Sequence, residues 1–188
     1  MKRFYKEVSV GEGEDGFRVL LDGRPVKTPA KHFLALPTRA LAEAIAVEWA
    51  GQGDEIAPLS MPFLRLADTV IDGVAANRPA VVEAILRFGE NDLLCYRAHQ
   101  PPDLVQLQSQ GWDPILDWAR RRFGAEFVVV EGFGHQDQPL QTLAAFRAAL
   151  ENQDSFSLAA LHVVASIAGS VVLALALAEG ELVPGQLF

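Results

Sequence analysis

Residues 158–180 read LAALHVVASIAGSVVLALALAEG, and the first 21 of them carry no charged side chain. A helix of about 20 apolar residues is long enough to cross a bilayer, so this stretch decides between a membrane span and a core helix. No Lys or Arg follows residue 147, and neither end has the Trp or Tyr that commonly anchors a span. We therefore predict one buried helix from Leu158 to Ala178, with His162, Ser166 and Ser170 in a stripe along one face.

The composition is that of a folded, acidic protein. The chain has 188 residues, of which 50% are hydrophobic, and its net charge is −8 at pH 7. This charge disfavours binding to nucleic acid phosphates or to anionic lipid. Cys95 is the only cysteine, so no intrachain disulfide can form, as is typical of a reducing compartment. Because the opening MKRFYKEVSV also lacks an apolar signal core, we expect a cytoplasmic protein without membrane insertion.

Residues 1–60 predict a small β-rich domain. The segments KRFYKEVSV and FRVLLDGRPVKTP are short and rich in residues that favour strands. Asp22-Gly23 lies between two such runs and indicates a two-residue hairpin turn, because its central positions need positive φ. Thr38 is placed to cap a helix in TRALAEAIAVEWAGQG, where Leu41, Ile45 and Trp49 recur every four residues.

Residues 61–188 predict a helical domain, so the fold class is α+β with a β-rich domain at 1–60 and a helical bundle at 61–188. Apolar residues recur at helical spacing through most of this region, and EFVVVEG is its one strand-like segment. Asp113 is placed to cap the helix PILDWARRRFG, with Pro114 at its favoured first position.

The sequence predicts no catalytic residue, no cofactor and no metal site. Residues 11–16, GEGEDG, match a dinucleotide-binding pattern, but a strand follows them instead of a helix, and their acidic side chains would repel phosphate. The four histidines lack metal-ligand spacing. Cys95 lies between apolar neighbours, which favours an inert thiol, although a Cys95–His99 dyad stays open as an alternative. Glu90 and Asp92 of GEND are of the type that serves acid/base chemistry, but we interpret Asn91 or Asp92 as the cap of a turn.

Several segments, in order along the chain, are similar to one known family. They are RFYKEVSV, FRVLLDGRPVKTPAKH, LALPTRALAEAIAVEWA, MPFLRLADTVIDGV, NDLLCYRA, WDPILDWA and LALALAEG. As a set they resemble the assembly chaperone of the ATP synthase alpha subunit, often called the ATP-twelve family. The resemblance covers the chain from Arg3 to about Gly180. His32-Phe33 replaces the usual His-Pro of the family, and Phe63 stands where a smaller residue is typical.

The resemblance implies a non-enzymatic chaperone that holds the unassembled alpha subunit and prevents its aggregation. It also implies an α+β N-terminal domain and an orthogonal helical domain, and a monomer when free. Members of the family normally continue past GQLF into a further acidic helical segment, so this chain is expected to be a shortened member. Aromatic and Arg side chains dominate interface energetics, and basic groups steer acidic partners, so the candidate partner-binding residues are Arg24, Lys27, Tyr96, Arg97, Trp112 and Trp118.

Two other functions remain open from the sequence. One is a small hydrolase or transferase that uses Cys95 and a nearby histidine. The other is an adaptor anchored in a membrane by residues 158–178.

Overall fold

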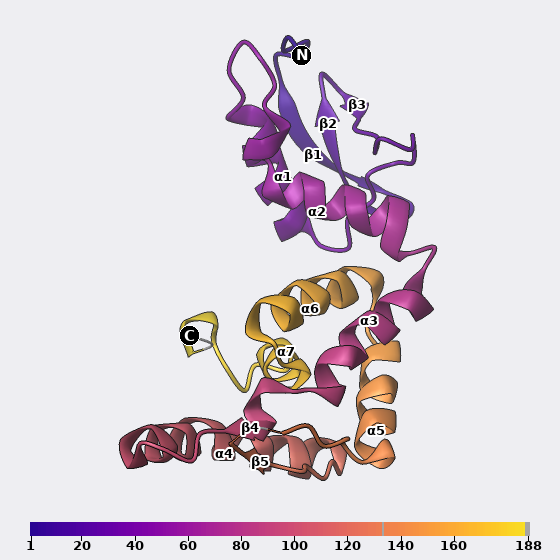
Figure 1. Ribbon diagram of the computed structural model, residues 1–188. Coiled ribbons are helices and arrows are strands. Elements are labelled where there is room, and N and C mark those ends of the chain that lie inside the picture. The colour runs from indigo at the N-terminus through magenta and orange to yellow at the C-terminus, as the bar shows by residue number, and fades with distance from the viewer. Residues whose placement is uncertain (133, 187–188) are drawn as a thin grey trace. The chain divides into compact units, whose positions relative to one another are not determined.

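The computed structural model describes residues 1–132 and 134–186 (Figure 1). The chain forms two compact units, Met1–Asn77 and Arg78–Phe188. The boundary expected from the sequence was residue 60. The units divide later because the helix that begins at Pro62 packs against the preceding helix of the first unit. The fold is α+β, as predicted: a small N-terminal sheet is followed by a helical region.

The first unit contains a three-stranded antiparallel sheet in the order β1-β2-β3. Its strands are β1 (Val8–Gly13), β2 (Gly16–Leu21) and β3 (Arg24–Pro25). The turn between β2 and β3 is Asp22-Gly23, with φ of 48° and 76°, so the predicted hairpin is confirmed. The carboxylate of Asp22 accepts hydrogen bonds from the backbone N–H groups of Lys6 at 3.0 Å and Glu7 at 2.8 Å, which ties the turn to the N-terminal segment.

Two helices complete this unit. α1 (Arg39–Ala50) begins after Thr38, whose hydroxyl accepts from Leu41 N–H at 3.2 Å, as predicted. It packs against β1 and β2 through a buried face of Ala42, Ile45 and Trp49 (Figure 1). After the short turn η1 (Pro58–Ser60), α2 (Pro62–Thr69) continues into a π-helical turn, η2 (Val70–Val74). The Glu48 carboxylate of α1 caps α2 by accepting from Phe63 N–H at 2.7 Å and Leu64 N–H at 2.9 Å.

The second unit is mostly helical (Figure 1). Its elements are α3 (Arg78–Glu90), η3 (Leu93–Cys95), β4 (Tyr96–Arg97), α4 (Pro102–Phe123), β5 (Val130–Glu131), α5 (Leu140–Glu151), α6 (Ser155–Ala168), α7 (Val171–Ala178) and η4 (Pro184–Gln186). β4 and β5 form a parallel pair, in which Tyr96 lies opposite Val130. α7 contacts α3, α4 and α6, and its residues from Val171 to Ala176 are all buried, so this short helix forms the centre of the unit.

The predicted single helix from Leu158 to Ala178 is wrong, because the chain breaks into α6 and α7. Gly169 ends α6 with a left-handed φ of 65°, and Ser170 then caps α7 by accepting from Leu173 N–H at 3.0 Å. At 1.5 Å per residue the 14 residues of α6 and the 8 of α7 rise only about 21 and 12 Å, short of the 30 Å of a bilayer core. In the described part of the chain, no helix is long and apolar enough to cross a membrane.

The predicted helix start at Asp113 is also wrong, because α4 runs through Pro114 without interruption. Proline removes one hydrogen bond from the helix ladder, which normally costs about 3 kcal/mol in a helix interior. Contacts on both sides of Pro114 offset this cost. Gln108 and Asp113 contact the segment after η3, whereas Leu116, Trp118 and Ala119 are buried in the unit. Sequence pattern alone could not show these contacts.

Candidate functional site

The structure distributes the six candidate residues over both units. Arg24 lies in β3 of the first unit and Lys27 lies two residues beyond the end of that strand, and both side chains are exposed. Tyr96, Arg97, Trp112 and Trp118 lie in the second unit. The surroundings of these four residues differ, and a core position was the alternative expected above all for the two tryptophans.

Trp118 belongs to the core of the second unit. Its side chain is 9% exposed and packs edge-on against Phe123, with ring centroids 5.4 Å apart. Phe123 in turn packs edge-on against the fully buried Phe146. This arrangement gives Trp118 a packing role in the helical unit.

Arg97 is the centre of a cluster between β4 and the middle of α4. Its side chain is buried, and its Nε donates to the Leu94 carbonyl at 2.8 Å. Its Nη2 lies 2.8 Å from Oδ1 of Asp113, and its guanidinium group lies over the Trp112 ring, 5.2 Å from the centroid. Close by, Ala98 N–H donates to the side chain of Gln108 at 2.8 Å. The cluster therefore fixes the position of α4 through a planar group that pairs with a carboxylate and stacks on an aromatic ring.

Tyr96 lies beside this cluster and is partly exposed. Its hydroxyl donates to Asn91 Oδ1 at 3.2 Å and lies 3.2 Å from Nδ1 of His135. The Nε2 atom of His135 is 3.1 Å from Asp137 Oδ1. This row of polar groups connects the end of α3 with the loop before α5, and it leaves part of the tyrosine ring open to solvent.

The first half of α4 carries a feature that the sequence analysis missed. None of residues 102–111 is buried, although the segment includes three aliphatic side chains. Leu104 is 41% exposed and Leu107 is 66% exposed, while Val105 is partly covered. We call residues 102–111 the α4 projection. The i, i+3 spacing of Leu104 and Leu107 in DLVQLQ was the available signal, because it marks one apolar helix face that needs a partner.

Cys95 has the environment of an inert thiol. Its side chain is fully buried, and burial raises the pKa of the thiol to about 12. The thiolate, which is the nucleophile, is therefore scarce at neutral pH. In residues 1–132 and 134–186, no hydrogen bond joins Cys95 to a histidine, and no three His, Cys, Asp or Glu side chains are grouped as metal ligands are.

Comparison with known proteins identifies the family. The model of the ATP12 chaperone proteins matches residues 2–120, which is more than half of the chain. The chain belongs to the ATP12 chaperone family. The matched residues include the β-rich unit, the Arg97 cluster and nearly all of α4, so the candidate residues all lie inside the region that defines the ATP12 family.

Solved structures of ATP12 proteins agree with this assignment along the whole chain. The crystal structure of Atp12 from Paracoccus denitrificans is 39% identical, with a TM-score of 0.94, over 99% of this chain and 80% of that one. A single-residue mutant of the same protein gives the same values. The Atu1473 protein of Agrobacterium tumefaciens, which has been put forward as a chaperone, is 50% identical, with a TM-score of 0.91, over 99% of this chain and 70% of that one. Family membership supports a chaperone function in ATP synthase assembly.

Proposed function

We propose that this protein binds the unassembled alpha subunit of an ATP synthase, prevents its aggregation, and does so without catalysing a reaction. It acts as a monomer when free, in the bacterial cytoplasm. The observation that carries this proposal is the α4 projection in a chain of the ATP12 family: three aliphatic side chains lie on a helix segment that has no buried residue.

The chemistry of the projection suits an unassembled subunit. A subunit that normally lies in a ring presents a large interface, which is more apolar than ordinary surface when it belongs to a permanent complex. A chaperone that covers such an interface needs exposed aliphatic or aromatic side chains of its own. Leu104 and Leu107 supply these on one face, and the partly exposed Trp112 lies about two helical turns beyond Val105, on the adjoining side of the helix.

The Arg97 cluster has a different role in this proposal. Because Arg97 is buried and paired with Asp113, it positions α4 and does not reach a partner by itself. Trp112 and Tyr96 are partly exposed at the base of the projection, so they supply aromatic contact area there. Trp118 contributes by packing in the core of the second unit. Arg24 and Lys27 are exposed in the first unit, where they attract acidic groups of the partner.

Sedimentation velocity with the purified alpha subunit tests this proposal. We expect one complex with the unchanged protein and loss of that complex with the double variant Leu104→Glu/Leu107→Glu, because two charges would enter an apolar contact. Leu140→Glu is the matched control, since Leu140 is 85% exposed in the same unit but lies on α5. If the alpha subunit binds the double variant as well as it binds the control, the α4 projection is not the site. If the alpha subunit binds neither the unchanged protein nor either variant, the proposed function itself is rejected.

A further inference from the structure

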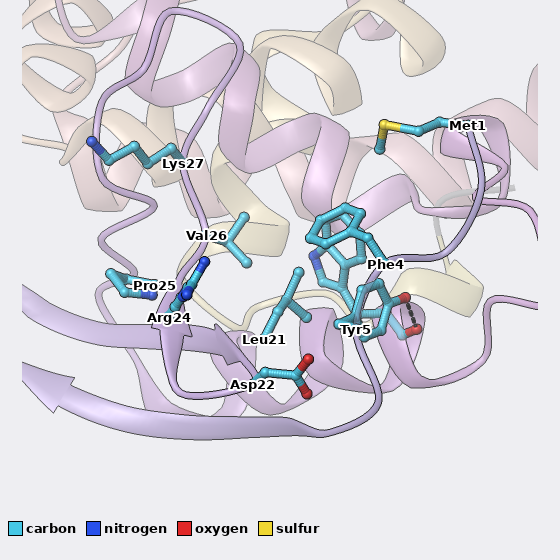
Figure 2. A pocket seen from close by; sticks show the side chains of 10 residues that line it. Met1, Phe4, Tyr5, Leu21, Asp22, Arg24, Pro25, Val26 and Lys27 are labelled. Atoms are coloured by element: carbon cyan, nitrogen blue, oxygen red, sulfur yellow. Dashed lines mark hydrogen bonds between the residues drawn. The ribbon is translucent and has the colours of Figure 1, made fainter.

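The first unit contains a cavity of about 570 Å³ whose lining includes Arg24 and Lys27, to which the proposed function gives only the attraction of acidic groups. Figure 2 shows residues 24–27 along one side of it, and Met1 and Phe4 on the opposite side. Tyr5 and Leu21 lie between these two sides, and Trp49 also lines the cavity. The volume lies within the range of about 300–1,000 Å³ that is usual for ligand pockets, so a bulky apolar side chain can enter.

In the part of the chain that the structure describes, the cationic groups at this cavity form no ion pairs, although the charge of Arg24 contributes to the lowered pKa of Asp22. Among the ion pairs of the described residues, none includes Arg24 or Lys27. The one carboxylate in the lining is Asp22, which is already bonded to the backbone N–H groups of Lys6 and Glu7, and these bonds lower its pKa. The Lys27 ammonium lies 4.8 Å from the centroid of the Phe33 ring, a contact that leaves it free to pair with an anion.

Trp49 provides a second, independent observation. It lines the cavity and is 8% exposed, and its Nε1 atom is buried without a hydrogen-bond partner among the described residues. An indole N–H without an acceptor is uncommon in a protein interior and costs about 1–3 kcal/mol. Because Trp49 lines the cavity, a bound ligand should change the environment of this N–H.

We propose that this cavity is a binding site for a polypeptide segment in which a bulky apolar side chain lies between two carboxylates. The apolar side chain fills the cavity between Val26 and Phe4, and the carboxylates pair with Arg24 and Lys27. The segment is a partner of opposite local charge, recognised by an apolar anchor and flanking ion pairs.

Titration of the full, ¹⁵N-labelled protein with short peptides tests this site. The probe is an acetylated and amidated pentapeptide with the central sequence Glu-Phe-Glu. We expect it to shift the backbone signals of residues 21–27 and the indole N–H signal of Trp49, because both line the cavity. A peptide with Lys-Phe-Lys tests the charges, and one with Glu-Ala-Glu tests the anchor. We expect each of these to bind at least about tenfold more weakly.

Charge reversal of the protein gives the matched comparison. The double variant Arg24→Glu/Lys27→Glu should lose the Glu-Phe-Glu shifts, whereas Arg65→Glu, an exposed substitution on α2, should keep them. Because all three side chains are exposed, the melting temperatures should stay the same. Equal binding of the Lys-Phe-Lys peptide, or shifts that do not include Trp49, would overturn the proposal. Concentration-dependent shifts of the same signals without peptide would assign the cavity to a second copy of this chain and would also overturn it.

Discussion

Asp92 accepts a hydrogen bond from the backbone N–H of Val172 at 3.1 Å, across 80 positions of sequence. The same carboxylate accepts from Leu94 N–H at 3.0 Å, and both bonds are buried. Asp92 therefore caps η3 and the first turn of α7 together, and it joins the segment that leads to Arg97 to the most buried helix of the second unit. The sequence predicted a capping role for this carboxylate, but only within its own turn.

The ionisation of Asp92 should make stability depend on pH. Burial raises the pKa of this carboxyl to about 6 from an ordinary 3.8. Between about pH 4 and pH 6 the folded chain thus keeps a proton that the unfolded chain has released, so the fold loses stability as the pH rises. Relative to Asp92→Asn, which cannot ionise, the free energy of unfolding should fall by about 2 kcal/mol from pH 4 to pH 7.

Urea denaturation of both proteins at pH 4, 5, 6 and 7 measures this difference. Because all other titrating groups are shared, their contributions cancel in the comparison. If the free energy of unfolding of the unchanged protein instead rises with pH relative to that of Asp92→Asn, the hydrogen bonds to Asp92 outweigh its burial. The carboxylate is then held ionised.

Two glycines of the second unit should respond to alanine in opposite directions. A Cβ atom at Gly89 of α3 would lie 3.2 Å from Val171 Cγ1 and 3.4 Å from Phe146 Cδ2, which is tight for a buried contact. Gly89→Ala should therefore destabilise the fold by about 1–2 kcal/mol. Gly111 lies inside α4 with nothing within 4 Å of such a Cβ, so Gly111→Ala should stabilise the fold by up to about 1 kcal/mol.

Equilibrium unfolding in urea gives both values. The pair is informative because the same substitution is made in two helices of one unit. Stabilisation by Gly89→Ala would show that α3 does not approach α5 and α7 as closely as the contacts require.

Gly169 should reveal whether α6 and α7 are separate helices. Its φ of 65° is unfavourable for residues with a Cβ atom, while the nearest side-chain atom, Leu93 Cβ, would lie 3.7 Å away without a clash. Gly169→Ala should therefore cost about 1 kcal/mol through the backbone alone, and Gly169→Asn should cost less. If the segment were one continuous helix, alanine would increase stability, and the sign of the change would refute the break.

Features that depend on residues close together in the sequence were predicted correctly, whereas features that depend on distant residues were not. The hairpin at Asp22-Gly23 and the cap at Thr38 were predicted because each depends on residues within a few positions of one another. Gly169 could also have indicated the break between α6 and α7. The apolar run around it, and the place of the α7 cap Ser170 in the expected polar stripe, favoured one continuous helix instead. The parallel pairing of β4 with β5 could not be predicted, because it joins residues more than 30 positions apart.

The candidate site shows the same limit. Tyr96, Arg97 and Trp112 were chosen for their residue types, and the structure does bring them to one region around α4. The burial of Trp118 and the exposure of Leu104 and Leu107 depend on how far α4 extends beyond the core. That extent followed from the continuity of the helix through Pro114, which a local rule for proline predicts incorrectly.

Light scattering of the alpha subunit after dilution from denaturant tests the central claim most directly. In the presence of ATP, an equimolar amount of this protein should suppress the rise in scattering without releasing phosphate. Leu140→Glu should protect equally well, and Leu104→Glu/Leu107→Glu should not. Identical scattering with and without the protein, in a sample whose circular dichroism shows it to be folded, would contradict the account.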